Sequence, residues 1–176
     1  MPIEALDGFW RGLLQPILMS SHALALFGLG LLIGQQRADR RIVLLGSFVL
    51  ALIAGLGALA LAVGETPAGN VLLAGVAISG VLTALALPLP TWSLAPIVLV
   101  IGAALGLDSP PDVISLSAAY LMLLGAGLAA SIGLGLVSEG SARLRRGWQR
   151  MGVRVLGSWA AASAMLALAV RYAAGV

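Results

Sequence analysis

The chain has 176 residues, of which 60% are hydrophobic and 10% are charged, and its mean hydropathy is +1.06. A soluble domain carries about 25% charged residues, so this composition excludes a soluble globular protein and predicts an integral membrane protein. The absence of cysteine excludes disulfides, thiolate metal sites and thiol catalysis. All ten basic residues are arginines, and most lie in two short clusters beside apolar runs, a pattern typical of membrane orientation and not of nucleic-acid binding.

Apolar runs long enough to cross a bilayer recur along the chain. A helix needs about 20 apolar residues to cross a bilayer core of roughly 30 Å. Short polar or proline-rich breaks separate the runs, so we predict one all-α transmembrane domain over residues 1–176, a bundle of about six helices. The expected spans are residues 14–34, 42–63, 70–88, 92–107, 113–137 and 152–172.

The break between the third and fourth expected spans is the shortest. Only a few residues around Pro88 and Pro90 separate the two apolar runs. The two segments therefore form either a tight hairpin of two spans or a re-entrant pair that does not fully cross.

The distribution of charge predicts the orientation in the membrane. If the spans alternate, the breaks at 35–41, 88–91 and 138–150 lie on one side, while Asp108 and most of the other acidic residues lie on the other side with both termini. By the positive-inside rule the arginine-rich side is cytoplasmic, so both termini lie outside the bacterial cytoplasmic (inner) membrane. The arginines that carry this orientation signal are Arg37, Arg40, Arg41, Arg143, Arg145 and Arg146.

Small residues recur at a spacing of four, as in the pairs Gly30 with Gly34 and Gly102 with Gly106. This spacing lets helix backbones approach closely in lipid. The pattern predicts close packing within the bundle. The alternative is a helix surface offered to another membrane subunit, in addition to the lipid bilayer.

The sequence carries no enzyme motif. Because lysine is absent, no Walker-type phosphate loop is present, and a single histidine excludes an H-E-x-x-H metal site. Within the expected spans the ionisable residues are His22 and, near the ends of the last span, Arg154 and Arg171, whose long side chains can reach the interface. We therefore expect no enzyme and no resident cofactor.

The segment GFWRGLLQPILMSSH, residues 8–22, gathers polar residues at the entrance of the first expected span. Gln15, Met19 and His22 are spaced by four and three residues, which predicts one helix face. Amide, thioether and imidazole groups on that face are candidate ligands for a transported transition-metal ion. The alternative is a structural histidine that hydrogen-bonds to a neighbouring helix.

The residues before this face predict how the chain enters the membrane. Pro16 is expected in the first turn of the helix, where its missing N–H costs nothing. Phe9, Trp10 and Arg11 are expected to anchor the chain at the headgroups.

The run GFWRGLLQPILMSSHALALFGLGLLIGQQ, residues 8–36, resembles the first span of HupE/UreJ proteins, which typically shows a pattern like GFxxGxxHPxxGxDHxxxxxxxGL. Residues 69–90 and 147–169 resemble the third and last spans of that family more loosely. The resemblance implies a helical membrane protein associated with nickel supply, whose transported substrate is a nickel- or cobalt-type ion. The matching positions are Gly8, Phe9, Gly12, Pro16, His22 and Gly30.

The departures from the family pattern lie at its polar positions. Gln15 stands where the pattern has its first histidine, Met19 where it has glycine, and Ser21 where it has aspartate. Residues 101–106, IGAALG, also lack the histidines that are common in the family's fourth span. Two hypotheses follow: a divergent metal permease whose entry is lined by His22, Gln15 and Met19, or a structural or accessory subunit of a larger membrane complex that does not transport.

Overall fold

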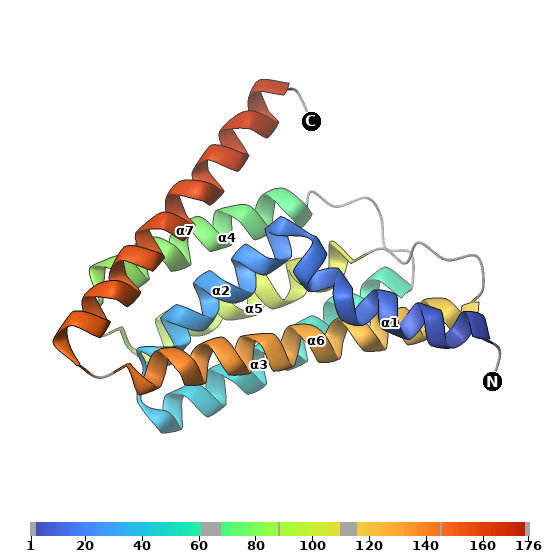
Figure 1. Ribbon diagram of the computed structural model, residues 1–176, viewed down its shortest axis with the longest axis horizontal. Helices are drawn as coiled ribbons and strands as arrows, with labels where there is room; N and C mark the ends of the chain where they lie inside the picture. The colour runs from blue at the N-terminus through green and yellow to red at the C-terminus, as the bar shows by residue number, and fades with distance from the viewer. Residues whose placement is uncertain (1–2, 61–67, 88, 110–115, 145, 175–176) are drawn as a thin grey trace.

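The protein is built from α-helices in all parts of the chain that the structure describes (Figure 1). The structure, a computed structural model, describes residues 3–60, 68–87, 89–109, 116–144 and 146–174. The prediction of an all-α protein is confirmed for these residues. The helices are α1 (Ile3–Leu18), α2 (Ser20–Gly34), α3 (Ala38–Ala60), α4 (Ala68–Leu85), α5 (Thr91–Leu107), α6 (Leu116–Arg143) and α7 (Gly147–Ala174).

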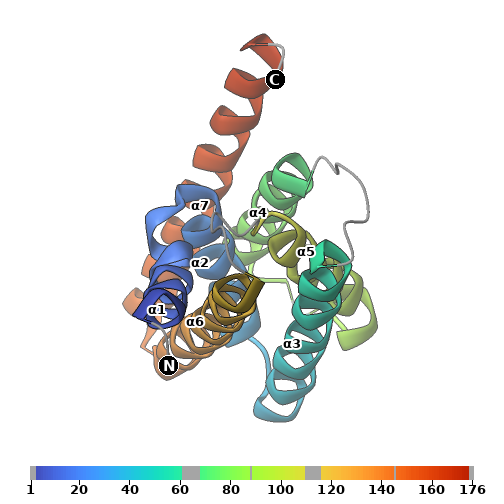
Figure 2. The same cartoon turned by 90° about the vertical axis from the view of Figure 1, so that its right-hand side faces the viewer.

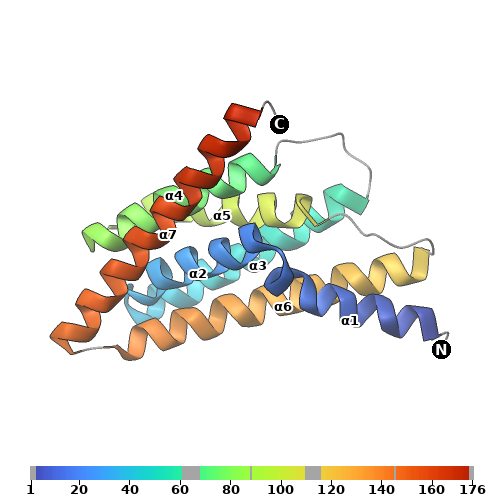
Figure 3. The same cartoon turned by 45° about the horizontal axis from the view of Figure 1, so that its top comes forward.

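The first expected span is a bent pair of helices. The axes of α1 and α2 differ by 67°, and Met19 between them has an extended backbone with φ −85° and ψ 111°. Figure 3 shows α1 lying along α6 before the chain turns into α2. The prediction that Pro16 lies in the first turn of a helix is wrong, because Pro16 lies near the C-terminal end of α1.

The early start of α1 follows from its close contact with α6. A Cβ atom added to Gly8 would lie 2.7 Å from the carbonyl oxygen of Ala118, and one added to Gly12 would run into the backbone of Met122. Only glycine allows the two backbones to approach this closely, and such packing holds helices together in lipid. The segment before residue 14, predicted to lie outside the span, is therefore helical because α6 supports it.

Four helices of the described chain, α3, α4, α6 and α7, are long and apolar enough to cross a membrane. The bent pair α1 and α2 adds a fifth candidate if it counts as one span. The remaining apolar helix, α5, has 17 residues, and its partner across the short third break is α4. The count of six spans, the outside location of the termini and the choice between hairpin and re-entrant pair stay predictions.

The helix α2 runs through the interior of the bundle. Ten of its fifteen residues are buried, and it contacts α4, α6 and α7. A helix that is apolar on all sides belongs in the interior of a helical protein. By contrast, Figures 1 and 2 both show the C-terminal part of α7 extending beyond the other helices.

Two of the predicted small-residue pairs pack inside the chain. A Cβ atom on Gly34 would lie 2.6 Å from the carbonyl oxygen of Ser138 in α6, and one on Gly106 would lie 2.7 Å from the carbonyl oxygen of Leu52 in α3. The prediction of close helix packing is confirmed at these positions. A contact between small-residue faces and another subunit stays a prediction.

Candidate functional site

His22 and Asp108 form a polar pair at one end of the buried helix α2. The Nε2 atom of His22 lies 3.2 Å from Oδ2 of Asp108. His22 is fully buried in the first turn of α2, whereas 29% of the Asp108 side chain is exposed. Asp108 is the C-cap residue of α5, and its backbone N–H donates to the carbonyl of Ala104. The pair thus joins two helices through side chains 86 residues apart.

The second carboxylate oxygen of Asp108 faces the start of α4. A Cβ atom on Gly69 would lie 3.3 Å from Oδ1 of Asp108 and 2.6 Å from Nη1 of Arg171. The same Nη1 atom donates a hydrogen bond to Oδ1 of Asn70 at 3.3 Å. Glycine at position 69 therefore leaves the space that the side chains of Arg171 and Asp108 occupy beside the start of α4.

Helix ends contribute to the electrostatics of this pair. The carboxylate of Asp108 contacts a residue of the first turn of α2 and faces Gly69 in the first turn of α4. Helix N-termini carry partial positive charge and stabilise nearby anions. The carboxylate therefore lies beside the N-terminal turns of α2 and α4, although Asp108 caps the C-terminal end of α5.

Two buried polar atoms near the bend between α1 and α2 make no hydrogen bond with any residue that the structure describes. They are Nδ1 of His22 and Oε1 of Gln15. Gln15 is 5% exposed, and its Nε2 atom lies 4.0 Å from the sulfur of Met19. Most buried polar side-chain atoms in folded proteins have a partner. An imidazole nitrogen and an amide oxygen are therefore left with lone pairs or protons that a bound species can satisfy.

The three predicted ligands do not lie on one helix face. Gln15 belongs to α1, Met19 is the extended residue at the bend, and His22 belongs to α2. The predicted single face is wrong because the helix breaks at Met19, where the chain leaves α6 and enters the core. Met19 is 39% exposed. In the part of the chain that the structure describes, no three or more His, Cys, Asp or Glu side chains gather where they could hold a metal ion.

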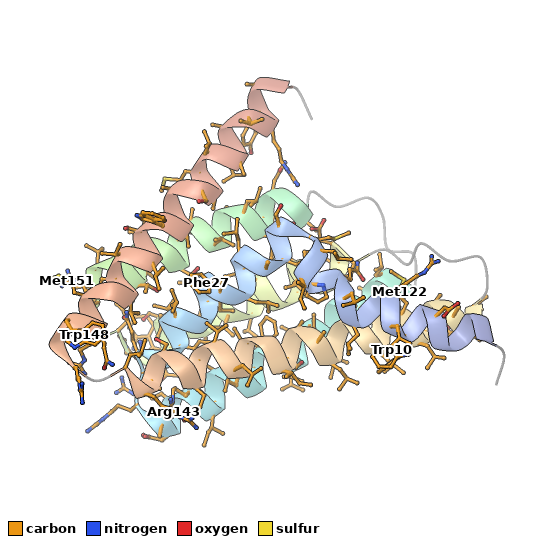
Figure 4. The ribbon with its side chains drawn as sticks, in the orientation of Figure 1. Trp10, Phe27, Met122, Arg143, Trp148 and Met151 are labelled. Carbon is orange, nitrogen blue, oxygen red and sulfur yellow. The ribbon has the colours of Figure 1, made fainter. Side chains whose placement is uncertain are left out.

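The expected anchors lie on α1. The rings of Phe9 and Trp10 contact each other edge to face, with centroids 6.0 Å apart. Trp10 is 58% exposed and projects from the outer side of α1 in Figure 4, and Arg11 is exposed as well. The role of the three residues at the headgroups stays a prediction.

The expected basic junctions meet at the opposite end of α2, on the left of Figure 1. Arg40 donates to the carbonyl of Leu89 at 3.4 Å, and Arg41 pairs with Glu139 at 3.3 Å. These contacts join the junctions around residues 35–41, 88–91 and 138–150, which the charge pattern predicted on one side. Arg143 and Arg146 are exposed at the same end, and Arg145 lies outside the described residues. The prediction that this end faces the cytoplasm is not tested by the fold.

Asp108, Arg171 and Asn70 were not expected as site residues. Sequence reasoning counted Asp108 as a charge between spans and Arg171 as an arginine reaching the interface. One signal was present in the sequence: in the alternating arrangement of spans, His22 near the start of the first and Asp108 at the end of the fourth fall at the same end of the bundle.

The several long apolar helices define a multi-pass helical membrane protein. The sequence matches the HupE / UreJ protein family over residues 2–168, and the chain therefore belongs to the HupE/UreJ family. No curated protein and no solved structure matches the chain.

Proposed function

We propose that this protein transports a transition-metal ion of the nickel or cobalt type across the bacterial cytoplasmic membrane, with His22 and Asp108 as ligands of the transported ion. The observation that carries the proposal is the contact between Nε2 of the buried His22 and Oδ2 of the partly exposed Asp108 at 3.2 Å. Membership in a family with a nickel or cobalt transport or accessory role supports the same assignment.

The donor chemistry of the pair suits a borderline divalent ion. Imidazole nitrogen and carboxylate oxygen are ligands that such ions accept. The unpartnered Oε1 of Gln15 is a further neutral donor, and the sulfur of Met19 is a softer one. Because ligands bind metal in their deprotonated forms, an arriving ion would replace the hydrogen bond between His22 and Asp108, and the proton of that bond would be released to water.

Asp108 also accounts for the departure at residue 21. The family pattern has an aspartate directly before the histidine, and this chain has Ser21 there. In this protein a carboxylate reaches His22 from the end of α5 instead. A ligand pair of the same chemistry is thus assembled from two helices.

The test is uptake of nickel or cobalt by proteoliposomes that contain the purified full chain. We expect uptake by the wild type, and at least a tenfold loss in both His22→Ala and Asp108→Asn. Asp39→Asn is the matched control, because it removes an exposed carboxylate at the other end of the bundle. Circular dichroism of each variant excludes loss of folding. No uptake by the wild type, or full uptake by Asp108→Asn, contradicts the proposal.

A second candidate is a structural or accessory subunit that does not transport. The small donor set favours it, because His22 and Asp108 are the only two ionisable donors in contact among the residues described at this end. The candidate predicts that the protein co-purifies in fixed stoichiometry with other membrane chains in mild detergent. Isolation of the chain alone from native membranes argues against it.

A further inference from the structure

The arginine-rich end of the bundle contains a cavity of about 820 Å³. Its walls come from the junctions between α2 and α3, α4 and α5, and α6 and α7. No Asp or Glu of the described chain lines it. The five arginines that line it are Arg37, Arg40, Arg41, Arg150 and Arg154.

Three of these arginines are fixed by contacts within the protein. Arg154 Nε donates to the carbonyl of Ala84 at 2.7 Å, Arg40 bonds the carbonyl of Leu89, and Arg41 pairs with Glu139 at the cavity's edge. A guanidinium has five N–H donors, and each of these contacts uses one nitrogen. The fixed side chains therefore retain further donors, and their positions are set before a ligand arrives.

The other two arginines have no fixed partner. Neither Arg37 nor Arg150 makes a side-chain hydrogen bond or ion pair with any residue that the structure describes. Guanidinium groups bind phosphate with two parallel hydrogen bonds and keep their charge at every physiological pH. Five guanidinium groups around one cavity, one of them paired with Glu139, thus offer donors of the kind that suit a phosphate-bearing anion.

Apolar groups beside the arginines favour a lipid as the source of that phosphate. Leu87, Leu144 and Val153 line the same cavity. Trp148 and Met151, at the start of α7, are 72% and 67% exposed, and Figure 4 shows both on the outer side of that helix. Exposed tryptophan is typical of the membrane interface, and basic pockets between transmembrane helices bind anionic headgroups.

We propose that this cavity binds a phosphate-bearing anion, and that the anion is the headgroup of an anionic phospholipid whose glycerol and acyl groups follow the apolar start of α7. The positive-inside rule explains why arginines lie at this end of the bundle. It does not explain why five of them line one cavity. The proposal is independent of metal transport, since the cavity and the His22–Asp108 pair lie at opposite ends of α2.

The test measures retained lipid by native mass spectrometry. Purified full-length protein is equilibrated with mixtures of phosphatidylglycerol and phosphatidylcholine. We expect the wild type to retain phosphatidylglycerol preferentially, and Arg37→Gln combined with Arg150→Gln to weaken this preference about 30-fold, the factor expected for two basic residues at the surface. The control combines Arg143→Gln with Arg146→Gln, which removes the same charge at the same end but outside the cavity.

Each outcome has a defined meaning. Loss of preference in the cavity variant and retention in the control support the proposal, and circular dichroism checks that both variants fold. If both variants lose the preference for phosphatidylglycerol equally, surface charge alone attracts the lipid and the proposal is wrong. The proposal is also wrong if the cavity variant keeps the full preference. In a parallel arm, inorganic phosphate replaces the lipid. If phosphate raises the melting temperature through the same arginines while no phosphatidylglycerol is retained, the ligand is a soluble anion and the lipid assignment is wrong.

Discussion

The polar groups at the two ends of α2 differ in number and in surroundings. At its N-terminal end, one buried imidazole meets one carboxylate, and two buried polar atoms have no partner among the described residues. At its C-terminal end, five arginines line an open cavity, and two of them, Arg40 and Arg154, donate to backbone carbonyls. We call the first end the dry end, because His22 and Gln15 are buried there, and the second the wet end, because its arginines line an open cavity. Contacts of buried polar groups change the free energy of unfolding more than contacts of exposed charges, which water screens.

The largest expected effect comes from separating α1 from α6 at the dry end. Gly12→Leu places a side chain into the backbone of Met122, and we expect it to lower the free energy of unfolding by about 3 kcal/mol, as overpacking does. Gly57→Leu is the control, because apart from the backbone of its own helix and its chain neighbours no described atom lies within 4 Å of a Cβ at that position. Thermal unfolding followed by circular dichroism in detergent measures both. Equal stability of the two variants would contradict the packing described for α1.

An intermediate effect is expected from the polar pair itself. A double-mutant cycle of His22→Ala and Asp108→Ala is expected to give a coupling energy of about 1 kcal/mol, the usual net value of a hydrogen bond. The cycle is measured by denaturant unfolding of the four proteins. The control is a double-mutant cycle of His22→Ala and Asp39→Ala. Because Asp39 lies at the other end of the bundle, this cycle should give no coupling energy. A zero coupling between His22 and Asp108 would mean that their contact does not form in the membrane protein.

The smallest effect is expected at the wet end. Arg41→Gln breaks the pair with Glu139, in which the arginine is 18% exposed and the glutamate 50%, and should lower the free energy of unfolding by about 0.5 kcal/mol at low salt. Because salt screens charges near the surface, the difference should shrink further at about 1 M salt. Arg143→Gln, whose side chain is 78% exposed, should be weaker still. If Arg41→Gln lowered the free energy of unfolding by more than the coupling energy between His22 and Asp108, the contrast between the two ends would be wrong.

The residues of the wet end could be predicted from the sequence, whereas those of the dry end could be predicted only in part. The alternation of the expected spans predicts that the arginine-rich breaks share one end of the bundle, and charge is then used only to predict which side of the membrane that end faces. Gln15 and His22 were identified as unusual polar residues, and both are buried. The partnership of His22 with Asp108 depends on how α2 and α5 pack, and periodicity within one segment carries no information on that.

The bend at Met19 shows the same limit. Residues 14–34 are apolar enough to predict one continuous span, and nothing in their periodicity indicates a break. The break arises because the glycines of α1 fit the backbone of α6 while α2 fits the core. Tertiary packing therefore decides where the helix ends, and Met19 takes the extended conformation between two fixed helices.

Calorimetric titration of the purified full chain in lipid with Ni²⁺ tests the central claim most directly, because it measures the ion at the His22–Asp108 pair without requiring transport. The account predicts saturable binding of about one ion per chain by the wild type and by Asp39→Asn, and a loss of at least tenfold in affinity in Asp108→Asn and His22→Ala. A wild type that binds neither Ni²⁺ nor Co²⁺, or an Asp108→Asn variant that binds as tightly as the wild type, would contradict it.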